Sequence, residues 1–179
     1  MKKTLKVALY ILLALVLIVL AYVIYVFAAY YRVEDMQKLG VAHCDAASAA
    51  PMADAPQTGV TYRVSSANVG FGAYSDDYSF FMDGGKESRA RSRQAVDENM
   101  RGEVSLVKDL SPDFALFQEV DIDGTRSWHI AEDAYLDDVM GNSEFNKVFA
   151  QNYDSPYLFY PLINPHGANQ SGILTLSRH

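Results

Sequence analysis

Cysteine is almost absent from this sequence: Cys44 is the single one, so an internal disulfide cannot form. A zinc site made from several cysteines is excluded for the same reason. An excess of basic residues is also missing, because the formal net charge is −7 and the sequence pI is about 5.0. A broad basic face for nucleic acid is therefore not supported.

The length sets an upper limit on the number of domains. The chain has 179 residues, and an apolar N-terminal run and a linker take up part of them. The remainder is enough for about one modest domain with a real core.

The apolar run covers residues 5–31 and is interrupted only by Lys6. A helix that crosses a bilayer needs about 20 such residues, whereas the apolar core of a cleaved signal peptide has about 7–15. Lys2, Lys3 and Lys6 lie at its N-terminal end, which favours a cytoplasmic N-terminus. We predict that residues 1–32 form a cytoplasmic tip and an uncleaved signal anchor of the cell membrane. The alternative is cleavage near Ala28.

Residues 33–59 have the composition of a flexible linker. Alanines alternate with polar residues and with Pro51 and Pro56, and little of this can form a core. A short helix over residues 33–41 is an alternative for its first part.

A globular domain is predicted for residues 60–179. It begins with a β-strand over residues 61–69 that ends near Asn68, just before Gly70 and Gly72. A helix follows over residues 92–110, with apolar side chains at spacings of three and four. An unbroken apolar strand comes next, at residues 114–117. This order predicts an α/β fold in which the two strands are neighbours and the helix covers one face.

Glu119 is the main candidate for a functional residue. The apolar strand ends just before it, and in open α/β sheets ligands bind beyond the carboxyl ends of the strands. Asp121 and Asp123 follow closely, and three neighbouring carboxylates repel one another unless a cation or a basic group offsets them. The alternative interpretation is a strand that runs into a solvated acidic turn.

The loop over residues 73–93 combines four aromatic side chains with a basic group. The basic residues are Lys86, Arg89, Arg91 and Arg93. Guanidinium groups match the geometry of a phosphate, so the group favours an anionic ligand. The alternative is the solvated start of the following helix.

The last part of the chain alternates between helix and strand patterns. We predict a helix over residues 131–140, a strand over 144–151, an aromatic stretch of loop and strand over 152–161, a turn at 164–167 and a strand over 171–178. A strand at the very end leaves an exposed sheet edge, which proteins normally protect. The pattern suggests a chain that stops before its fold is complete.

Three of these segments resemble the endonuclease/exonuclease/phosphatase superfamily, which includes DNase I, apurinic endonucleases, sphingomyelinases and inositol-phosphate 5-phosphatases. They are the strand end ANVG at residues 67–70, the stretch PDFALFQEVD at residues 112–121 and the stretch SGILTLSR at residues 171–178. The loop FFMDGGK at residues 80–86 looks like that of membrane-anchored bacterial members. The resemblance covers about residues 60–179 and implies the N-terminal half of a DNase I-like four-layer α/β sandwich.

The resemblance also implies roles for individual residues. Glu119 matches the family's glutamate that binds Mg²⁺ (or Mn²⁺), and Asn68 matches the asparagine that helps to place that metal. The family's Asp-x-Asn pair, late aspartate and Ser-Asp-His motif are not found after Ser171. We add Arg89, Arg126, His129 and His166 as candidates for binding the substrate phosphate.

Together these features predict a membrane-anchored, metal-dependent phosphodiester hydrolase, present as an N-terminal fragment that is inactive alone. The predicted substrate contains phosphate, as nucleic acid or phospholipid does, and no obligate protein partner is evident. The alternative is a membrane-tethered, non-catalytic binding or scaffold domain.

The predicted topology can be tested with reporter fusions. We expect a reporter fused after Ala55 to be active only on the extracytoplasmic side, because Lys2, Lys3 and Lys6 retain the N-terminus in the cytoplasm. Activity of the same fusion in the cytoplasm would contradict this orientation.

Overall fold

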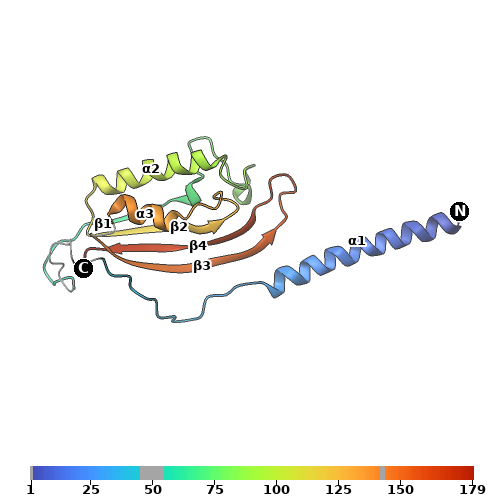
Figure 1. The fold of residues 1–179 in the computed structure, drawn as a ribbon, viewed down its shortest axis with the longest axis horizontal. Helices are drawn as coiled ribbons and strands as arrows, with labels where there is room; N and C mark the ends of the chain where they lie inside the picture. Colours follow the sequence, from blue (N-terminus) through green and yellow to red (C-terminus); the bar gives the residue numbers. More distant parts are fainter. Residues whose placement is uncertain (1, 45–54, 142–143) are drawn as a thin grey trace.

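The computed structural model describes residues 2–44, 55–141 and 144–179 (Figure 1). It is a mixed α/β structure with a four-stranded sheet and an N-terminal apolar helix. The elements are α1 (Lys2–Ala28), β1 (Val64–Asn68), the 3-10 turns η1 (Gly70–Gly72) and η2 (Phe81–Asp83), α2 (Arg93–Asp109), β2 (Phe114–Gly124), α3 (Glu132–Met140), β3 (Asn146–Leu158) and β4 (Gly167–Ser177).

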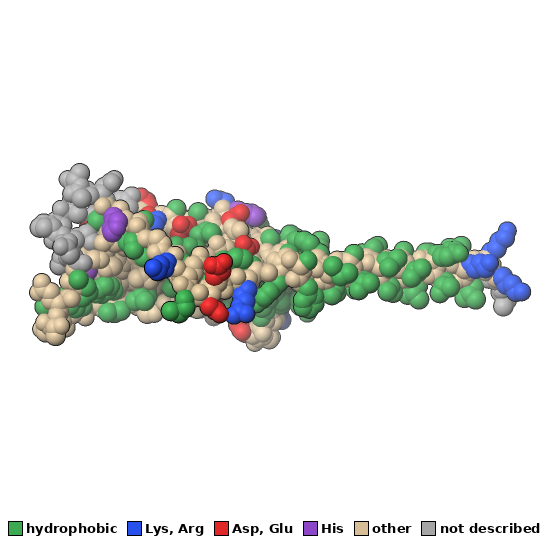
Figure 2. Space-filling model, turned by 90° about the horizontal axis from the view of Figure 1, so that it is seen from below, with side chains coloured by type: hydrophobic (Ala, Val, Ile, Leu, Met, Phe, Trp, Pro, Cys, Tyr) green, Lys and Arg blue, Asp and Glu red, His purple; other side chains and the backbone are tan. Residues whose placement is uncertain are grey.

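Helix α1 is long and apolar enough, by length and composition, to cross a membrane. Its 27 residues correspond to about 40 Å at 1.5 Å per residue. Hydrophobic side chains cover it along its length, and its lysines lie at the end far from the domain (Figure 2). Tyr22 and Val26, near its C-terminal end, are the two half-buried residues of the helix.

The described residues after α1 do not include the short helix considered for residues 33–41. That segment is extended apart from one turn, and Ala42 forms a pair of backbone hydrogen bonds with Lys147 of β3, each 2.8 Å long. The linker therefore covers part of the outer edge of β3, which satisfies backbone groups that an edge strand would otherwise expose.

The order of strands in the sheet is β1-β2-β4-β3. Strands β1 and β2 are parallel neighbours, as predicted from the strand–loop–helix–strand order, while β4 is antiparallel to both β2 and β3. The prediction that the last strand leaves an exposed edge is wrong. Strand β4 lies inside the sheet because β2 and β3 both pair with it.

Helices α2 and α3 cover the same face of the sheet (Figure 1). Ser92 caps α2 by accepting a hydrogen bond from the Ala95 amide, and the helix buries an apolar stripe of Val96, Met100, Val104 and Val107. Aligned residues of the four strands, Ala67, Phe117, Leu174 and Phe149, face this layer. On the other face of the sheet no helix of the described residues lies over Leu116 and Thr175, which are half-buried (Figure 1).

All four predicted strands have different limits in the structure, and β1 begins at Val64, three residues later than predicted. Strand β2 does not end at residue 117 but continues to Gly124, because β4 pairs with it after β1 has ended. The aromatic stretch expected as loop and strand is largely part of β3. Strand β4 begins at Gly167, four residues earlier than predicted.

Two carboxylic acids on the helices, Glu132 and Glu103, have raised pKa values. Glu132 of α3 is fully buried, and its Oε2 accepts a hydrogen bond of 2.8 Å from the Asp121 amide. Its Oε1 has no hydrogen-bond partner among the described residues. Burial raises the pKa of Glu132 well above its usual range, and the charge of Asp121 adds to the effect. Burial likewise raises the pKa of Glu103, on α2, to about 7.

These shifts give the free energy of unfolding a defined pH dependence. In the unfolded chain these glutamates lose their protons above a pKa of about 4.3, whereas in the folded chain Glu103 keeps its proton up to about pH 7. The free energy of unfolding therefore falls as the pH rises from about 4.3 to about 7. We expect Glu103→Gln to make the decrease in unfolding free energy with pH smaller. The measurement is the difference between the urea midpoints in acidic and in alkaline buffer. Glu98→Gln, on the exposed side of the same helix, is the control and should keep the wild-type slope.

Candidate functional site

The candidate site is centred on a β-bulge in β2. Phe117 pairs with Leu174 and Val120 pairs with Gly172, so Gln118 and Glu119 together face one residue of β4. Glu119 adopts a φ of 56°, which is uncommon for a residue other than glycine. Bulges and such backbone conformations are frequent beside active sites, where they redirect a side chain.

Asn68 and Glu119 meet at this bulge. Asn68 ends β1, and its Nδ2 donates a hydrogen bond of 2.9 Å to Oε1 of Glu119. Its Oδ1 accepts from the Gly70 amide at 2.9 Å, which fixes the orientation of the side-chain amide. The two residues that were predicted to act together are therefore in direct contact, although 51 positions separate them.

A cavity of about 400 Å³ opens beside this pair. Its lining comes from β1, β2, the middle of β3, β4 and the loops that follow β1, β2 and β3. The lining residues are Asn68, Phe80, Met82, Gln118, Glu119, Arg126, Asn152, Tyr153, His166, Ser171 and Ile173. Of the six predicted site residues, the structure brings Asn68, Glu119, Arg126 and His166 into this cavity.

Arg126 contributes a fixed positive charge to the cavity. Its Nε and Nη2 donate to the Asp121 carboxylate, with the shortest distance 2.7 Å, and its guanidinium lies 4.1 Å from the centre of the Phe71 ring. Burial alone would lower the pKa of Arg126, but the bonds and charge of Asp121 outweigh it and raise that pKa. The arginine is therefore charged and held in one orientation, as a phosphate-binding group requires.

His166 is buried, and its ring centre lies 5.8 Å from that of Phe80 and 5.7 Å from that of Phe81. Its Nδ1 lies 2.9 Å from the carbonyl oxygen of Ser88. A carbonyl can only accept, so Nδ1 carries the proton and Nε2 is the acceptor in the neutral ring. Burial lowers the pKa of His166, which favours this neutral form.

Asp121 and Asp123 do not join Glu119, contrary to the expectation of three neighbouring carboxylates. Asp121 is fully buried and points to Arg126, while Asp123 is exposed and lies 2.6 Å from Nδ1 of His129. Regular alternation would place residues 119, 121 and 123 on one face of β2, but register shifts between Phe117 and Val120 and between Asp121 and Asp123 separate their side chains. His129 thus lies outside the cavity.

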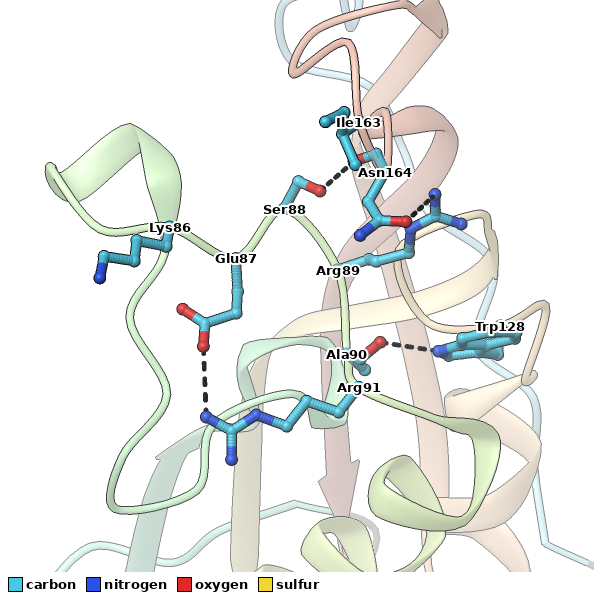
Figure 3. A pocket seen from close by; sticks show the side chains of 9 residues that line it. All are labelled: Lys86, Glu87, Ser88, Arg89, Ala90, Arg91, Trp128, Ile163 and Asn164. Carbon is cyan, nitrogen blue, oxygen red and sulfur yellow. Dashed lines mark hydrogen bonds and ion pairs between the residues drawn. The ribbon is translucent and has the colours of Figure 1, made fainter.

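Arg89 lies in a second cavity of about 320 Å³ (Figure 3). Its Nη2 is 3.5 Å from Oδ1 of Asn164, and Lys86, Arg91 and Trp128 also contribute to the lining. Two members of the predicted basic group are paired with protein groups. Arg91 pairs with Asp77 and Glu87, and Arg93 donates to the Trp128 carbonyl.

The cavity contains one carboxylate that is suited to a hard cation. Among the described residues, no group of three or more His, Cys, Asp or Glu side chains is placed to hold a metal. Within that part of the chain, Asn68 is the one hydrogen-bond donor to the Glu119 carboxylate. Mg²⁺ commonly uses one or two carboxylates and completes its shell with water and phosphate oxygens, so Glu119 fits as a single protein ligand.

Several lining residues were not found from the sequence. Tyr153 and Ser171 lie on neighbouring strands at the cavity, and Phe80 and Met82 come from the loop after η1. The aromatic stretches marked both segments as unusual, but nothing in the sequence showed that they meet.

No protein-family model, no curated protein and no solved structure matches this chain. The structure itself defines a mixed α/β domain joined to an apolar N-terminal helix, with a cavity where β1 ends and β2 bulges. The arguments for a function therefore depend on the residues of that cavity.

The buried ion pair beside the cavity can be tested by removing one charge. We expect Asp121→Asn to cost about 3–5 kcal/mol of unfolding free energy, because it leaves Arg126 buried without a counter-charge. Chemical denaturation of the full chain in detergent measures the effect. Asp97→Asn, which breaks the exposed pair with Arg101, is the control and should change little. Equal stability of the two variants would show that the Asp121–Arg126 pair does not stabilise the fold.

Proposed function

We propose that the chain provides the metal-binding and phosphate-binding part of a membrane-anchored phosphodiester hydrolase of the endonuclease/exonuclease/phosphatase type. In this proposal the sheet and its two helices belong to a DNase I-like α/β sandwich, and α1 anchors it with the N-terminus in the cytoplasm. The observation that carries the proposal is the contact of Asn68 with Glu119 in one cavity with Arg126 and His166.

Glu119 would hold Mg²⁺ or Mn²⁺ with one carboxylate, and Asn68 would keep that carboxylate in place. The bound ion would supply Lewis-acid polarisation of a phosphoryl oxygen. The rest of the chemistry falls to the side chains of the cavity. Among these, Asn68 is already fixed through the Gly70 amide, so it orients Glu119 at no further cost in entropy.

Arg126 supplies the charge that attracts the phosphate. Its Nε and Nη2 are used by Asp121, and no acceptor for Nη1 is found among the described residues. This N–H group is available to a phosphate oxygen in the cavity, where low exposure strengthens the bond. His166 presents a neutral ring to the same space, and its Nε2 accepts a proton or a hydrogen bond from a water molecule or a substrate hydroxyl.

The sheet supports the proposed fold in one further respect. Helices cover one face, and the other presents half-buried side chains such as Leu116 and Thr175 without a helix of the described residues over them. A second sheet packed there is what a four-layer sandwich requires.

Metal binding is the first test, because it does not need every catalytic group. We expect the full chain in detergent to bind Mn²⁺, measured by loss of the free-ion signal in electron paramagnetic resonance. Glu119→Gln keeps the shape but removes the charge, and we expect about tenfold weaker binding or more. Asp123→Asn is the matched control, since this exposed carboxylate of the same strand lies outside the cavity.

Hydrolysis is the second test. In an enzyme that also contains the remaining catalytic groups, we expect Mg²⁺-dependent cleavage of a phosphodiester to disappear in Glu119→Gln. The thermal melt in a chelator should stay close to that of the wild type, because glutamine keeps the shape of the side chain and can still accept a hydrogen bond from Asn68. Metal binding or turnover that survives the substitution would overturn the assignment. The chain would then be better described as a tethered binding domain.

A further inference from the structure

The connection between β3 and β4 exposes a cluster of large apolar side chains. We define the loop tip as residues 159–163. Within it Phe159 is 56% exposed, Tyr160 69%, Leu162 88% and Ile163 84%. The tip contains no charged residue. So many neighbouring apolar side chains on one loop mark an interaction surface rather than ordinary surface composition.

The loop tip is fixed against the C-terminal end of α1. The Tyr22 hydroxyl donates to the Tyr157 carbonyl at 3.3 Å and accepts from the Phe159 amide at 3.1 Å. The Tyr25 hydroxyl accepts from the Tyr157 amide at 3.4 Å, and the rings of Tyr22 and Phe159 lie 5.4 Å apart, edge to face. The tip is thus held at the depth of Tyr22 along the helix.

The position of Tyr22 sets that depth relative to a bilayer. It precedes the end of α1 at Ala28 by six residues, or about 9 Å. The hydrocarbon core needs about 20 residues, and the lysines occupy the other end of the helix. A span of about 20 residues after Lys6 ends near Val26, so Tyr22 and Tyr25 lie in its last turns, next to the boundary of headgroups and acyl chains where tyrosine is enriched. Hydrophobic side chains also gather where α1 meets the domain (Figure 2).

Basic side chains flank the same loop. Ile163 and Asn164 line the second cavity together with Lys86 and Arg89 (Figure 3). Apolar side chains that enter an interface, bordered by lysine and arginine, are typical of surfaces that bind anionic lipid.

We propose that the loop tip inserts into the same bilayer that α1 crosses, on the side of the domain, and makes a second membrane contact. The proposal depends on α1 being a membrane anchor but not on phosphodiester hydrolysis. The loop tip contacts the lipid interface. Leu162 and Ile163 lie among the acyl chains, and Lys86 and Arg89 lie beside the headgroups.

Site-specific fluorescence of the full chain tests this contact. Cys44→Ser removes the native thiol, and cysteine is then introduced by Leu13→Cys, Leu162→Cys or Leu106→Cys and labelled with an environment-sensitive dye. The chain is placed in vesicles of phosphatidylcholine and phosphatidylglycerol that contain lipids with a spin label near the top of the acyl chain or at its middle. Leu106 is the matched control, because it is an exposed leucine (69%) on α2, on the other side of the domain from α1 (Figure 1).

We expect the shallow spin label to quench the dye at position 162 about threefold more strongly than it quenches the dye at position 106. The reason is that interfacial segments enter the boundary of headgroups and acyl chains to a depth of about 5–10 Å. Iodide, which stays in the water, should quench the dye at position 106 more strongly than the dye at position 162. Equal behaviour of positions 162 and 106, with position 13 quenched by the deeper lipid label, would overturn the loop contact and leave the anchor intact. Failure of lipid quenching at position 13 would overturn both.

Discussion

The buried ion pair between Asp121 and Arg126 connects the parts of the domain that form the cavity. Asp121 is in β2 beyond the bulge, and its backbone amide donates a hydrogen bond to Glu132 of α3. Its carboxylate binds Arg126, so this one residue connects the strand to both the helix and the arginine. The guanidinium packs on Phe71 of η1, and the Arg126 amide donates at 2.9 Å to Asn169 of β4. Removing two charges from water is costly, and only a full set of hydrogen bonds and close packing offsets that cost. The pair therefore constrains η1, β4 and the loop after β2 together.

This constraint explains how Glu119 can keep an unfavourable backbone conformation. A non-glycine residue at positive φ costs of order 1–3 kcal/mol and persists only when its surroundings determine it. On one side of the bulge Phe117 is buried in the core, and on the other Asp121 is held by Arg126. The strand between these fixed points contains one residue more than β4 opposite, so the extra length appears at Glu119 and directs its carboxylate to Asn68.

The sequence was sufficient for features that depend on local patterns. The apolar spacing predicts α2, and the strand order correctly makes β1 and β2 neighbours, which brings Asn68 and Glu119 together. It was not sufficient where long-range pairing decides. The place of β4 between β2 and β3, and with it the length of β2, follows from contacts between segments about 50 residues apart. The positive φ of Glu119 has no local signal, because glycine or asparagine is the residue usually found there.

The geometry also bears on how a substrate would reach the cavity. Phe80 and Met82 line it, and the neighbouring ring of Phe81 lies 5.8 Å from that of Tyr160 in the loop tip. A loop tip held in the lipid interface would thus place one wall of the cavity close to the headgroups. A lipid phosphodiester could then arrive by lateral diffusion, whereas free nucleic acid would approach a chain whose net charge of −7 repels it. Of the two proposed substrate classes, a loop tip placed in the lipid interface would favour the phospholipid.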